Sequence, residues 1–316
     1  MEQISLGQIA RDLNFRSLTP DIDVEGVMIS HPDINRPSLQ LTGFFEHFDN
    51  NRIQIMGNVE MAYLSTLSPG QRKLVFNELF KRNIPCLIYC RDHLPEEQVL
   101  GLAEQYQVPI LASHCFTSDV ASKTLRYLQE KLGPVQTIHG VLVDVMGVGV
   151  LITGESGIGK SEVALELIKR GHRLVSDDVV EIRKVSEVTL IGTAPPITKH
   201  FIELRGIGII DVKTLFGVSS VRDSQSIDME IHLEEWDKNR EYDRLGMEDN
   251  YTEYLGNRVL CYSVPVRPGR NVAIICEAAA ANHRQKLMGY NAAQELYKRV
   301  QDNLKRRSRE MDYEDD

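Results

Sequence analysis

Eight consecutive residues, Gly154 to Ser161, spell GESGIGKS and match the pattern G-x-x-x-x-G-K-[ST] at every fixed position. An apolar run, VGVLIT, precedes them, and an amphipathic helical pattern that ends before Gly171 follows. In this strand–loop–helix context the pattern predicts a phosphate-binding P-loop, because backbone N–H groups of a glycine-rich loop can point inward around phosphate oxygens. The chain is therefore expected to contain an α/β domain that binds a nucleotide or a polyphosphate.

The whole loop is expected to form the phosphate site: Gly154, Glu155, Ser156, Gly157, Ile158, Gly159, Lys160 and Ser161. Lys160 is expected to reach the β- and γ-phosphates, and the Ser161 hydroxyl is expected to bind Mg²⁺. The helix that starts at the loop adds a favourable dipole. The motif leaves the phosphate acceptor open: water, a small metabolite or another protein.

Two adjacent carboxylates, Asp177 and Asp178, end the apolar run that follows the P-loop helix. P-loop enzymes need a strand-end acidic group near the magnesium ion, and one carboxylate is enough for that purpose. The second could act as a general base toward an incoming hydroxyl. The sequence alone does not distinguish which of the two transfers the proton.

Missing motifs disfavour other nucleotide-dependent classes. Asp243 to Gly246 fit the loose D-x-x-G pattern of GTP switches, but no guanine-reading N-K-x-D sequence follows. The H-R-D, D-F-G and A-P-E motifs of eukaryotic protein kinases do not occur either. A generic P-loop hydrolase would leave the paired aspartates unexplained.

Three further stretches are unusual for a common P-loop enzyme. FIELRGIGIIDV places Glu203 and Arg205 just before a Gly-x-Gly turn, and VPVRPGRNVAI places Arg267 and Arg270 on a loop that prolines stiffen. His139 is expected at the start of the strand pair that leads to the P-loop. Taken singly, these stretches are explained by a surface turn, a Pro-Gly turn and a strand-end histidine.

Residues 1–132 are interpreted as an N-terminal α/β domain and residues 133–316 as the P-loop α/β domain, with the boundary at Gly133-Pro134. In the first domain, strands are predicted at 52–57, 84–90 and 108–113, and helices at 68–82, 94–106 and 117–132. This alternation predicts a parallel sheet with helices on its faces. Because the domain has no phosphate motif and no cluster of titratable groups, it is expected to serve assembly or regulation.

Two strand pairs and a helical end are expected in the second domain. HGVLVDVMGVGVLIT predicts two strands that meet at Gly147-Val148-Gly149, and HRLVSDDVVEIRKVSEVTLIG predicts another pair. The C-terminal segment, with the basic run KRVQDNLKRRSRE, is expected to be helical. A solvated helix is the simpler interpretation of this run, and a basic face that docks an acidic partner is the alternative.

Composition argues against several classes. The 316-residue chain has a net charge of −9, which disfavours nucleic acid as the main partner because phosphate backbones require a basic surface. It has no run of about 18 apolar residues, so no membrane-spanning helix is expected. The N-terminal MEQISLGQIARDLNF lacks the apolar stretch of a secretory signal, and five cysteines without a CxxC pair suit a reducing compartment. A cytoplasmic location is expected.

The stretches GESGIGKS, SDDVVEI, IELRGIGIIDV and PVRPGRN, in this order after a separate α/β domain, closely resemble the bacterial HPr kinase/phosphorylase family. The resemblance covers the second half of the chain, and ELRGIGIID is its most specific part. It implies an enzyme that phosphorylates a serine of HPr, the phosphocarrier of the sugar phosphotransferase system, with ATP or pyrophosphate. The same enzyme would remove the phosphate with inorganic phosphate and release pyrophosphate. Mg²⁺ dependence, a hexamer and a role in carbon catabolite repression are also implied.

The resemblance assigns roles to positions that match the family's motifs. Lys160 is implied as the P-loop lysine, Ser161 and Glu203 as Mg²⁺ ligands, and Asp178 as the base for phosphorylation and the proton donor for the reverse reaction. His139 and Arg244 are implied as further active-site residues.

The segment 202–211 is implied to matter for both reactions and the segment 265–270 for dephosphorylation, so Arg205, Arg267 and Arg270 are additional candidates. Asp177, the neighbour of Asp178, is a further one. Two other classes stay open: a nucleotide-switched regulatory module and a small-metabolite kinase.

Overall fold

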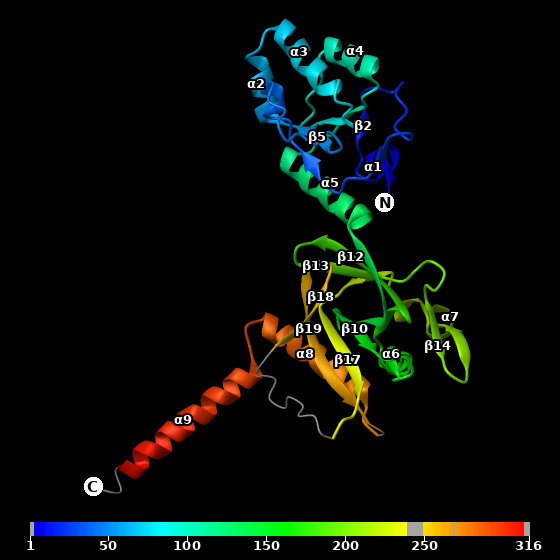
Figure 1. The fold of residues 1–316 in the computed structure, drawn as a ribbon, viewed down its shortest axis with the longest axis vertical. Helices are drawn as coiled ribbons and strands as arrows, with labels where there is room; N and C mark the ends of the chain where they lie inside the picture. The colour runs from blue at the N-terminus through cyan, green and yellow to red at the C-terminus, as the bar shows by residue number, and fades with distance from the viewer. Residues whose placement is uncertain (1–2, 239–248, 268, 313–316) are drawn as a thin grey trace. The chain divides into compact units, whose positions relative to one another are not determined.

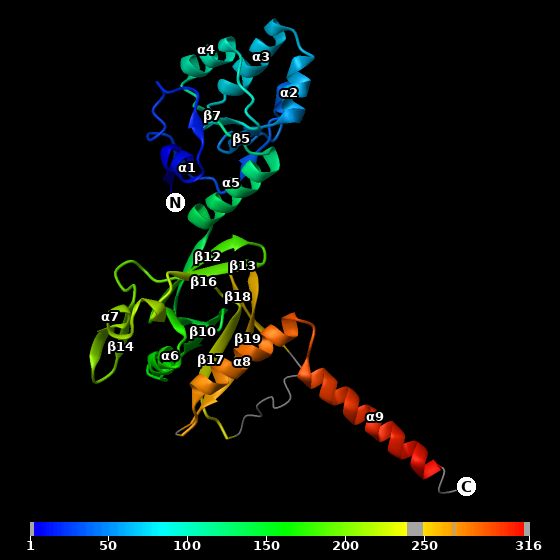
Figure 2. The same ribbon diagram turned by 180° about the vertical axis from the view of Figure 1, so that it is seen from behind.

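The computed structural model describes residues 3–238, 249–267 and 269–312 of the chain. These residues separate into two compact units, Met1–Gly133 and Pro134–Asp316, which are described in turn (Figure 1, Figure 2). Within the described ranges, no helix is both long enough and apolar enough to cross a membrane.

A largely parallel sheet forms the centre of the first unit, with strand order β2-β7-β6-β5-β4 in its described part. Its strands are β2 (Arg16–Ser17), β4 (Ile34–Asn35), β5 (Ile53–Met56), β6 (Leu87–Tyr89) and β7 (Ile110–Ala112). β4 to β7 run parallel, and β2 pairs with β7 in the antiparallel direction. β1 (Ile4–Ser5) and β3 (Met28–Ile29) form a separate antiparallel pair.

Helices cover both faces of this sheet (Figure 1). They are α1 (Leu6–Asp12), α2 (Asn58–Ser65), α3 (Pro69–Phe80), α4 (Glu97–Tyr106) and α5 (Thr117–Leu132), with the 3₁₀ helix η1 (Gln40–Thr42). α2, α3 and α4 pack on the face that carries Leu87 and Tyr89, and α1 and α5 pack on the face that carries Ile88. Because both faces are buried, the central strands β6 and β7 consist of continuous apolar runs. The predicted parallel sheet with helices on its faces is confirmed.

The start of α3 has the predicted capping box. Ser68 N donates to Gln71 Oε1 over 2.9 Å, and Gln71 N donates to Ser68 Oγ over 3.4 Å. Pro69 occupies the first helical position, where an N–H would have no partner within the helix. The prediction for this helix start is confirmed.

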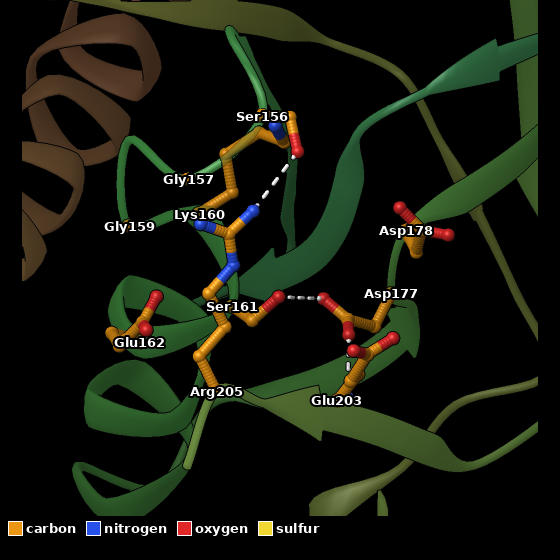
Figure 3. A pocket seen from close by; sticks show the side chains of 10 residues that line it. All are labelled: Ser156, Gly157, Gly159, Lys160, Ser161, Glu162, Asp177, Asp178, Glu203 and Arg205. Carbon is orange, nitrogen blue, oxygen red and sulfur yellow. Dashed lines mark hydrogen bonds between the residues drawn. The ribbon is translucent and has the colours of Figure 1, made fainter. Parts of the chain in front are cut away.

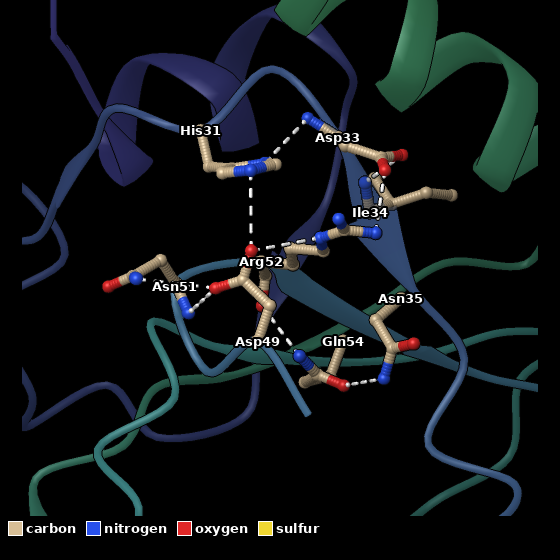
Figure 4. Close-up of polar contacts among 8 residues, drawn as sticks. All are labelled: His31, Asp33, Ile34, Asn35, Asp49, Asn51, Arg52 and Gln54. Atoms are coloured by element: carbon tan, nitrogen blue, oxygen red, sulfur yellow. Dashed lines mark hydrogen bonds and ion pairs between the residues drawn. The ribbon is translucent and has the colours of Figure 1, made fainter. Parts of the chain in front are cut away.

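Polar side chains tie the loop before β4 to the beginning of β5 (Figure 4). Asp49 accepts a hydrogen bond from Arg52 Nε over 3.1 Å, and Arg52 Nη1 lies 2.7 Å from Asp33 Oδ2. The buried Gln54 accepts from Asn35 Nδ2 over 2.7 Å and donates to Arg52 O over 2.7 Å. Because these bonds satisfy its amide, an apolar strand can carry a glutamine at this position.

A buried carboxylate lies just after β5. Glu60 has no exposed side-chain area, and it accepts hydrogen bonds from Gly57 N over 2.9 Å and from Ser38 Oγ over 2.6 Å. Arg36 Nη2 lies 2.8 Å from Glu60 Oε1. Burial raises the pKa of Glu60, but hydrogen bonds from Arg36, Ser38 and Gly57 outweigh it and leave the pKa below its ordinary value. The ionised form of Glu60 therefore stabilises the folded first unit.

Glu60→Ala is expected to lower the free energy of unfolding by about 2 kcal/mol, because the Gly57 amide and the Arg36 guanidinium lose their acceptor. Since the folded-state pKa is lowered, the contribution is complete above the ordinary glutamate pKa and is lost as the pH falls through the folded-state value. Chemical denaturation at neutral and at acidic pH measures both effects. Glu104→Ala, at an exposed position of α4, is the control, and equal stability of the two variants at neutral pH would contradict the prediction.

A mixed sheet with strand order β11-β9-β10-β17-β19-β18 forms the centre of the second unit, as far as it is described. Its strands are β9 (Val141–Val145), β10 (Val148–Gly154), β11 (Arg173–Ser176), β17 (Met229–Glu235), β18 (Asn250–Tyr254) and β19 (Asn257–Val266). β10, β17 and β19 run parallel, so their C-terminal ends meet at the edge where the P-loop begins. α6 (Lys160–Lys169) and α8 (Val272–Leu287) pack on one face.

A second sheet, with strand order β16-β13-β12-β8, packs against the other face. Its strands are β8 (Val135–His139), β12 (Val179–Ser186), β13 (Thr189–Thr193) and β16 (Ser224–Ser226). β14 (Phe201–Leu204) and β15 (Gly208–Asp211) form a separate hairpin. α7 (Val212–Phe216), the 3₁₀ helix η2 (Val218–Ser220) and α9 (Ala292–Asp312) follow in the chain. The predicted fold class, two α/β parts with C-terminal helices, is confirmed.

The hairpin before the P-loop turns earlier than predicted. Met146 (φ 53°) and Gly147 (φ 88°) form the two-residue turn between β9 and β10, whereas Val148 and Gly149 lie in β10. A Cβ at Gly149 would lie 1.6 Å from Ser226 O. This glycine therefore permits a close approach of backbones and does not form the turn.

Two other strand predictions were wrong in detail. His139 is the last residue of β8 and not the start of the pair that leads to the P-loop, because the chain passes from one sheet to the other at Gly140. The segment predicted as a second strand pair contains the three strands β11, β12 and β13. Asp177 and Asp178 separate β11 from β12, and the two strands belong to different sheets.

Candidate active site

The P-loop connects the end of β10 to the start of α6. Gly154 has φ 136°, and a Cβ there would lie 2.4 Å from Leu233 O of the neighbouring strand β17. Only glycine fits this conformation and this approach, which explains why the motif requires it. Gly159 is the N-cap residue of α6, so the loop ends at the helix terminus whose dipole favours phosphate.

A cavity of about 130 Å³ lies beside the loop (Figure 3). Its lining consists of Ser156, Gly157, Gly159, Lys160, Ser161, Glu162, Asp177, Asp178, Glu203 and Arg205. These residues come from the P-loop, from the junction of β11 and β12, and from the β14–β15 hairpin. Three separated segments that were candidates in the sequence thus meet at one place. Glu162 was not a candidate, although its place next to Ser161 in the first turn of α6 was a local signal for it.

The ends of two P-loop side chains are fixed by hydrogen bonds. Lys160 Nζ donates to Gly154 O over 2.8 Å and to Glu155 O over 3.0 Å. Ser161 Oγ donates to Asp177 Oδ1 over 2.8 Å. The cavity therefore has a cation and a hydroxyl at its base, the two groups that a P-loop uses for phosphate and its metal ion.

Asp177 connects the P-loop to the β14–β15 hairpin. It is only 4% exposed, its Oδ1 accepts from Ser161, and its Oδ2 accepts from Glu203 N over 2.9 Å. Burial raises the pKa of Asp177, the bonds from Glu203 N and Ser161 counteract this effect in part, and the charge of Asp178 adds to the rise. Ionisation of Asp177 is therefore less favourable than that of an ordinary aspartate, and a cation bound nearby would favour it.

Asp178 differs from its neighbour in exposure and in backbone conformation. Its side chain is 66% exposed, and its φ of 63° is left-handed, which redirects the chain from β11 into β12. His139 Nδ1 lies 3.7 Å from Asp178 Oδ1, and Gly140 N donates to Asp178 O over 3.0 Å. The two carboxylates point in different directions in Figure 3. Asp178 is thus an accessible carboxylate beside a histidine.

The β14–β15 hairpin brings Glu203 and Arg205 to the cavity. Ile202 and Leu204 are buried, so Glu203, which lies between them on β14, faces the other way. Arg205 Nη2 donates to Ser156 Oγ over 3.1 Å and so connects the hairpin to the P-loop. One wall of the cavity therefore carries a carboxylate and a guanidinium.

The predicted arginine loop does not line this cavity. Arg267 Cζ lies 3.1 Å from the ring centre of Trp236, and Arg270 Nη1 donates to Pro265 O over 3.1 Å. Trp236, the single tryptophan, was not a candidate from the sequence. It meets Arg267 because β17 and β19 pair up to their last residues, so no local pattern could have revealed the contact. Arg244 lies outside the described residues.

Residues with oxygen atoms suited to Mg²⁺ line the cavity together. The Ser161 hydroxyl, the Asp177 carboxylate and Glu203 belong to one hydrogen-bonded chain that lines it. Mg²⁺ prefers oxygen ligands and is commonly held by one or two carboxylates together with substrate phosphates. The donor set fits such an ion.

The fold and the cavity are those of a P-loop protein with an additional α/β unit. Two family models match the chain, the HPr Serine kinase N terminus over residues 4–128 and the HPr Serine kinase C-terminal domain over residues 130–300. A relative from Lachnoclostridium phytofermentans, named HPr kinase/phosphorylase, is 56% identical over 98% of this chain and 100% of its own. One of the same name from Caldicellulosiruptor bescii is 52% identical over 96% and 97%.

A solved structure, the Hpr(Ser) kinase/phosphatase from Coxiella burnetii, is 38% identical and covers 51% of this chain and 98% of that chain, with a TM-score of 0.46. On the family models and the relatives, the chain belongs to the HPr kinase/phosphorylase family and is an enzyme of that class. The resemblance drawn from the four sequence stretches is confirmed.

Proposed function

We propose that this protein transfers phosphate from ATP or pyrophosphate to a serine hydroxyl of HPr, and that it removes this phosphate with inorganic phosphate to give pyrophosphate. The names of the relatives support HPr as the substrate. The observation that carries the proposal is the meeting, in one cavity, of the P-loop residues Lys160 and Ser161 with two carboxylates in different environments. A buried carboxylate suits the donor and its metal ion, and an accessible one suits the acceptor and its proton.

Asp177 is proposed to position the donor side of the site. Its two oxygens already hold the Ser161 hydroxyl and the backbone of Glu203, so the Mg²⁺ ligands implied by the family resemblance are oriented by one buried group. Mg²⁺, when bound there with the phosphates, would neutralise part of their charge. Lys160 would leave its loop carbonyls and contact the β- and γ-phosphates.

Asp178 is proposed to transfer the proton. In phosphorylation its carboxylate accepts the proton of the serine hydroxyl as the serine oxygen bonds to the terminal phosphorus and the bond from phosphorus to the donor breaks. In dephosphorylation an oxygen of inorganic phosphate attacks the phosphoserine phosphorus, the serine oxygen leaves, and protonated Asp178 returns the proton to it. His139, 3.7 Å away, is placed to fix the orientation of Asp178.

Arg267 and Arg270 are proposed to bind an anion during dephosphorylation. Both residues are exposed, and each has a contact that holds its guanidinium near the strand ends, the Trp236 ring for Arg267 and Pro265 O for Arg270. A guanidinium with a fixed orientation loses less conformational entropy when it binds phosphate. Arg244 is proposed as an active-site residue on the family resemblance alone.

The experiment that tests the proposal follows labelled inorganic phosphate during dephosphorylation of seryl-phosphorylated HPr. The label is expected to appear in pyrophosphate, and HPr is expected to stay phosphorylated in phosphate-free buffer, because the phosphate ion is the attacking group. Arg267→Ala is expected to slow this reaction more than ATP-driven phosphorylation, and Arg258→Ala, at an exposed position of β19, is the control. If seryl-phosphorylated HPr lost its phosphate equally fast with and without added inorganic phosphate, the reaction would be a hydrolysis and not a phosphorolysis.

The wider role is proposed on the family resemblance. The protein is expected to act in the cytoplasm as a hexamer in carbon catabolite repression, with residues 133–316 as the catalytic part and residues 1–132 serving assembly or regulation. Nucleotide hydrolysis without any acceptor would favour a nucleotide-switched module, and transfer to a free hydroxylated metabolite would favour a small-metabolite kinase.

A further inference from the structure

A buried carboxylate that has no part in the proposed mechanism lies next to the start of the P-loop. Glu230, on β17, is 3% exposed, and the Thr153 hydroxyl donates to its Oε1 over 2.5 Å. Thr153 directly precedes Gly154, the first residue of the P-loop. The same hydroxyl oxygen lies 2.9 Å from His232 Nδ1. Glu230, Thr153 and His232 therefore form one hydrogen-bonded chain that ends on an imidazole beside the P-loop.

The direction of the hydrogen bonds in this chain follows from what each group can donate. An ionised carboxylate only accepts, so the Thr153 hydrogen points to Glu230, and the Thr153 oxygen accepts from His232 Nδ1–H. Nε2 is then the ring nitrogen that can serve a substrate. Burial raises the pKa of Tyr254 and of Cys261, and the charge of Glu230 adds to both rises, so these two neighbours stay neutral. The negative charge of Glu230 favours the imidazolium form of His232, in which Nε2–H is a donor.

Strand pairing puts His232 at the edge of the sheet where the P-loop begins. Thr153 is the register partner of His232 in the parallel pairing of β10 with β17. Ile231 and Leu233 belong to the core under α6 and α8, so His232, which lies between them in the chain, is on the opposite face of the sheet. It is partly exposed there, so a substrate can reach it.

Asp178 lies on the other side of Thr153. Gly140 N donates to Asp178 O over 3.0 Å, and a Cβ at Gly140 would lie 3.6 Å from Thr153 Cγ2. β9, which begins directly after Gly140, and β17 flank β10 on its two sides. Glycine at this position puts no side chain between Asp178 and Thr153. Asp178 and His232 are therefore placed on opposite sides of the P-loop start, where a phosphoryl group would pass to a serine.

We propose that His232 is a further catalytic residue: Nε2 donates a hydrogen bond to a non-bridging oxygen of the phosphoryl group during transfer, while Thr153 and Glu230 hold the ring. This proposal rests on the proposed function, in which the phosphoryl group passes between the P-loop and a serine beside Asp178. No proton leaves the imidazole in this step, because Asp178 accepts and returns the serine proton. The same phosphoryl group moves in both directions, so the contact serves both reactions.

Two substitutions of His232 separate this contact from a purely structural role. Asparagine places its amide near the position of Nδ1 and has no group at Nε2, whereas glutamine places its amide near Nε2. His232→Asn is expected to lower kcat by about 10² in HPr phosphorylation and in phosphate-driven dephosphorylation, as for one lost transition-state donor. His232→Gln is expected to lose less, about tenfold, because a donor stays near the Nε2 position.

His283→Asn is the matched control, because His283 is a partly buried histidine on α8, which packs on the opposite face of the same sheet. It is expected to leave kcat near the wild-type value. Calorimetric titrations with ADP and with the β,γ-imido analogue of ATP, each with Mg²⁺, give a readout that needs neither HPr nor turnover. His232→Asn should weaken binding of the analogue about fivefold, the effect of one hydrogen bond, and leave ADP binding unchanged. Only the analogue carries the phosphoryl group that His232 contacts.

Rates for His232→Asn near those of the control would overturn the proposal. A larger loss in His232→Gln than in His232→Asn would also overturn it, because the histidine would then act only through Thr153. Equal weakening of ADP and of the analogue is a third contrary result. Failure of the proposed function has a different signature: the wild-type protein would transfer no phosphate to HPr, and the two titrations would still decide whether His232 contacts the terminal phosphoryl group.

Discussion

Lys160→Ala is expected to slow phosphate transfer in both directions by roughly 10²–10³ while the chain stays folded. In the proposed mechanism the ammonium lies against the β- and γ-phosphates, where negative charge is redistributed as the phosphoryl group moves. Removal of one such stabilising contact costs roughly 3–4 kcal/mol in the transition state, or roughly 10²–10³ in rate. Phosphorylation and phosphorolysis should fall by similar factors, since both use the same cradle. The fold should survive, because Lys160 binds only the carbonyls of Gly154 and Glu155.

Initial rates of HPr phosphorylation and of phosphate-driven dephosphorylation measure this effect, with a circular dichroism spectrum as the check on folding. Lys169→Ala is the control, since Lys169 is an exposed lysine in the last turn of the same helix. Rates for Lys160→Ala near those of the control variant would show that the P-loop does not hold the transferred phosphate.

Asp178→Asn is expected to suppress both directions by about 10³, because a positioned proton acceptor contributes roughly that factor. Binding of ADP with Mg²⁺ should be retained, since Asp178 is exposed and makes no hydrogen bond to Ser161. Asp177→Asn should instead weaken binding of the Mg²⁺–donor complex, because it removes the charge between Ser161 and Glu203. The two neighbouring substitutions form a matched pair of the same chemistry.

Stability provides a second comparison for this pair. Because folding raises the pKa of Asp177, this residue binds a proton more readily in the folded chain than in the unfolded chain. The free energy of unfolding of the protein therefore falls as the pH rises above the ordinary aspartate pKa. Asp177→Asn removes the cost of burying this charge. The free energy of unfolding of the donor-free variant should therefore equal or exceed that of the wild type at neutral pH, and should not exceed it at acidic pH. Donor titrations and denaturation curves separate the roles. The roles of the two residues would be reversed by the following result: Asp177→Asn binds the donor normally but transfers phosphate slowly, and Asp178→Asn transfers phosphate at the normal rate.

Those parts of the fold and site that depend on neighbouring residues could be predicted from the sequence. Gly154 to Ser161 form the expected loop, because the conformations it needs are those that glycine permits. The Ser68–Gln71 cap and the apolar strands β5 to β7 also depend on short patterns. The same local reasoning identified Asp177 and Asp178 as residues at a strand end.

The rest depended on contacts between distant segments. The different environments of Asp177 and Asp178 arise from the left-handed backbone at Asp178 and from the hairpin that covers Asp177, and neither is visible in the pattern SDDVV. Gly149 was misread as part of a turn because its neighbour across the fold, Ser226, lies far along the chain. The contact of Arg267 with Trp236 depends on strand pairing alone.

The spacing of His139 and Asp178 is set by the alignment of two strands. Val179 lies opposite His139 in the antiparallel pairing of β12 with β8, which continues to Arg183 opposite Val135. Side chains alternate across a sheet, so a slip of one residue would turn His139 to the face away from Asp178. A substitution that shifts the pairing near Val135 and Arg183 would thus move His139 relative to Asp178 without contacting either residue. β8 is also the strand that follows directly after Gly133, so tension along the backbone from the first unit would reach this alignment before any other part of the site.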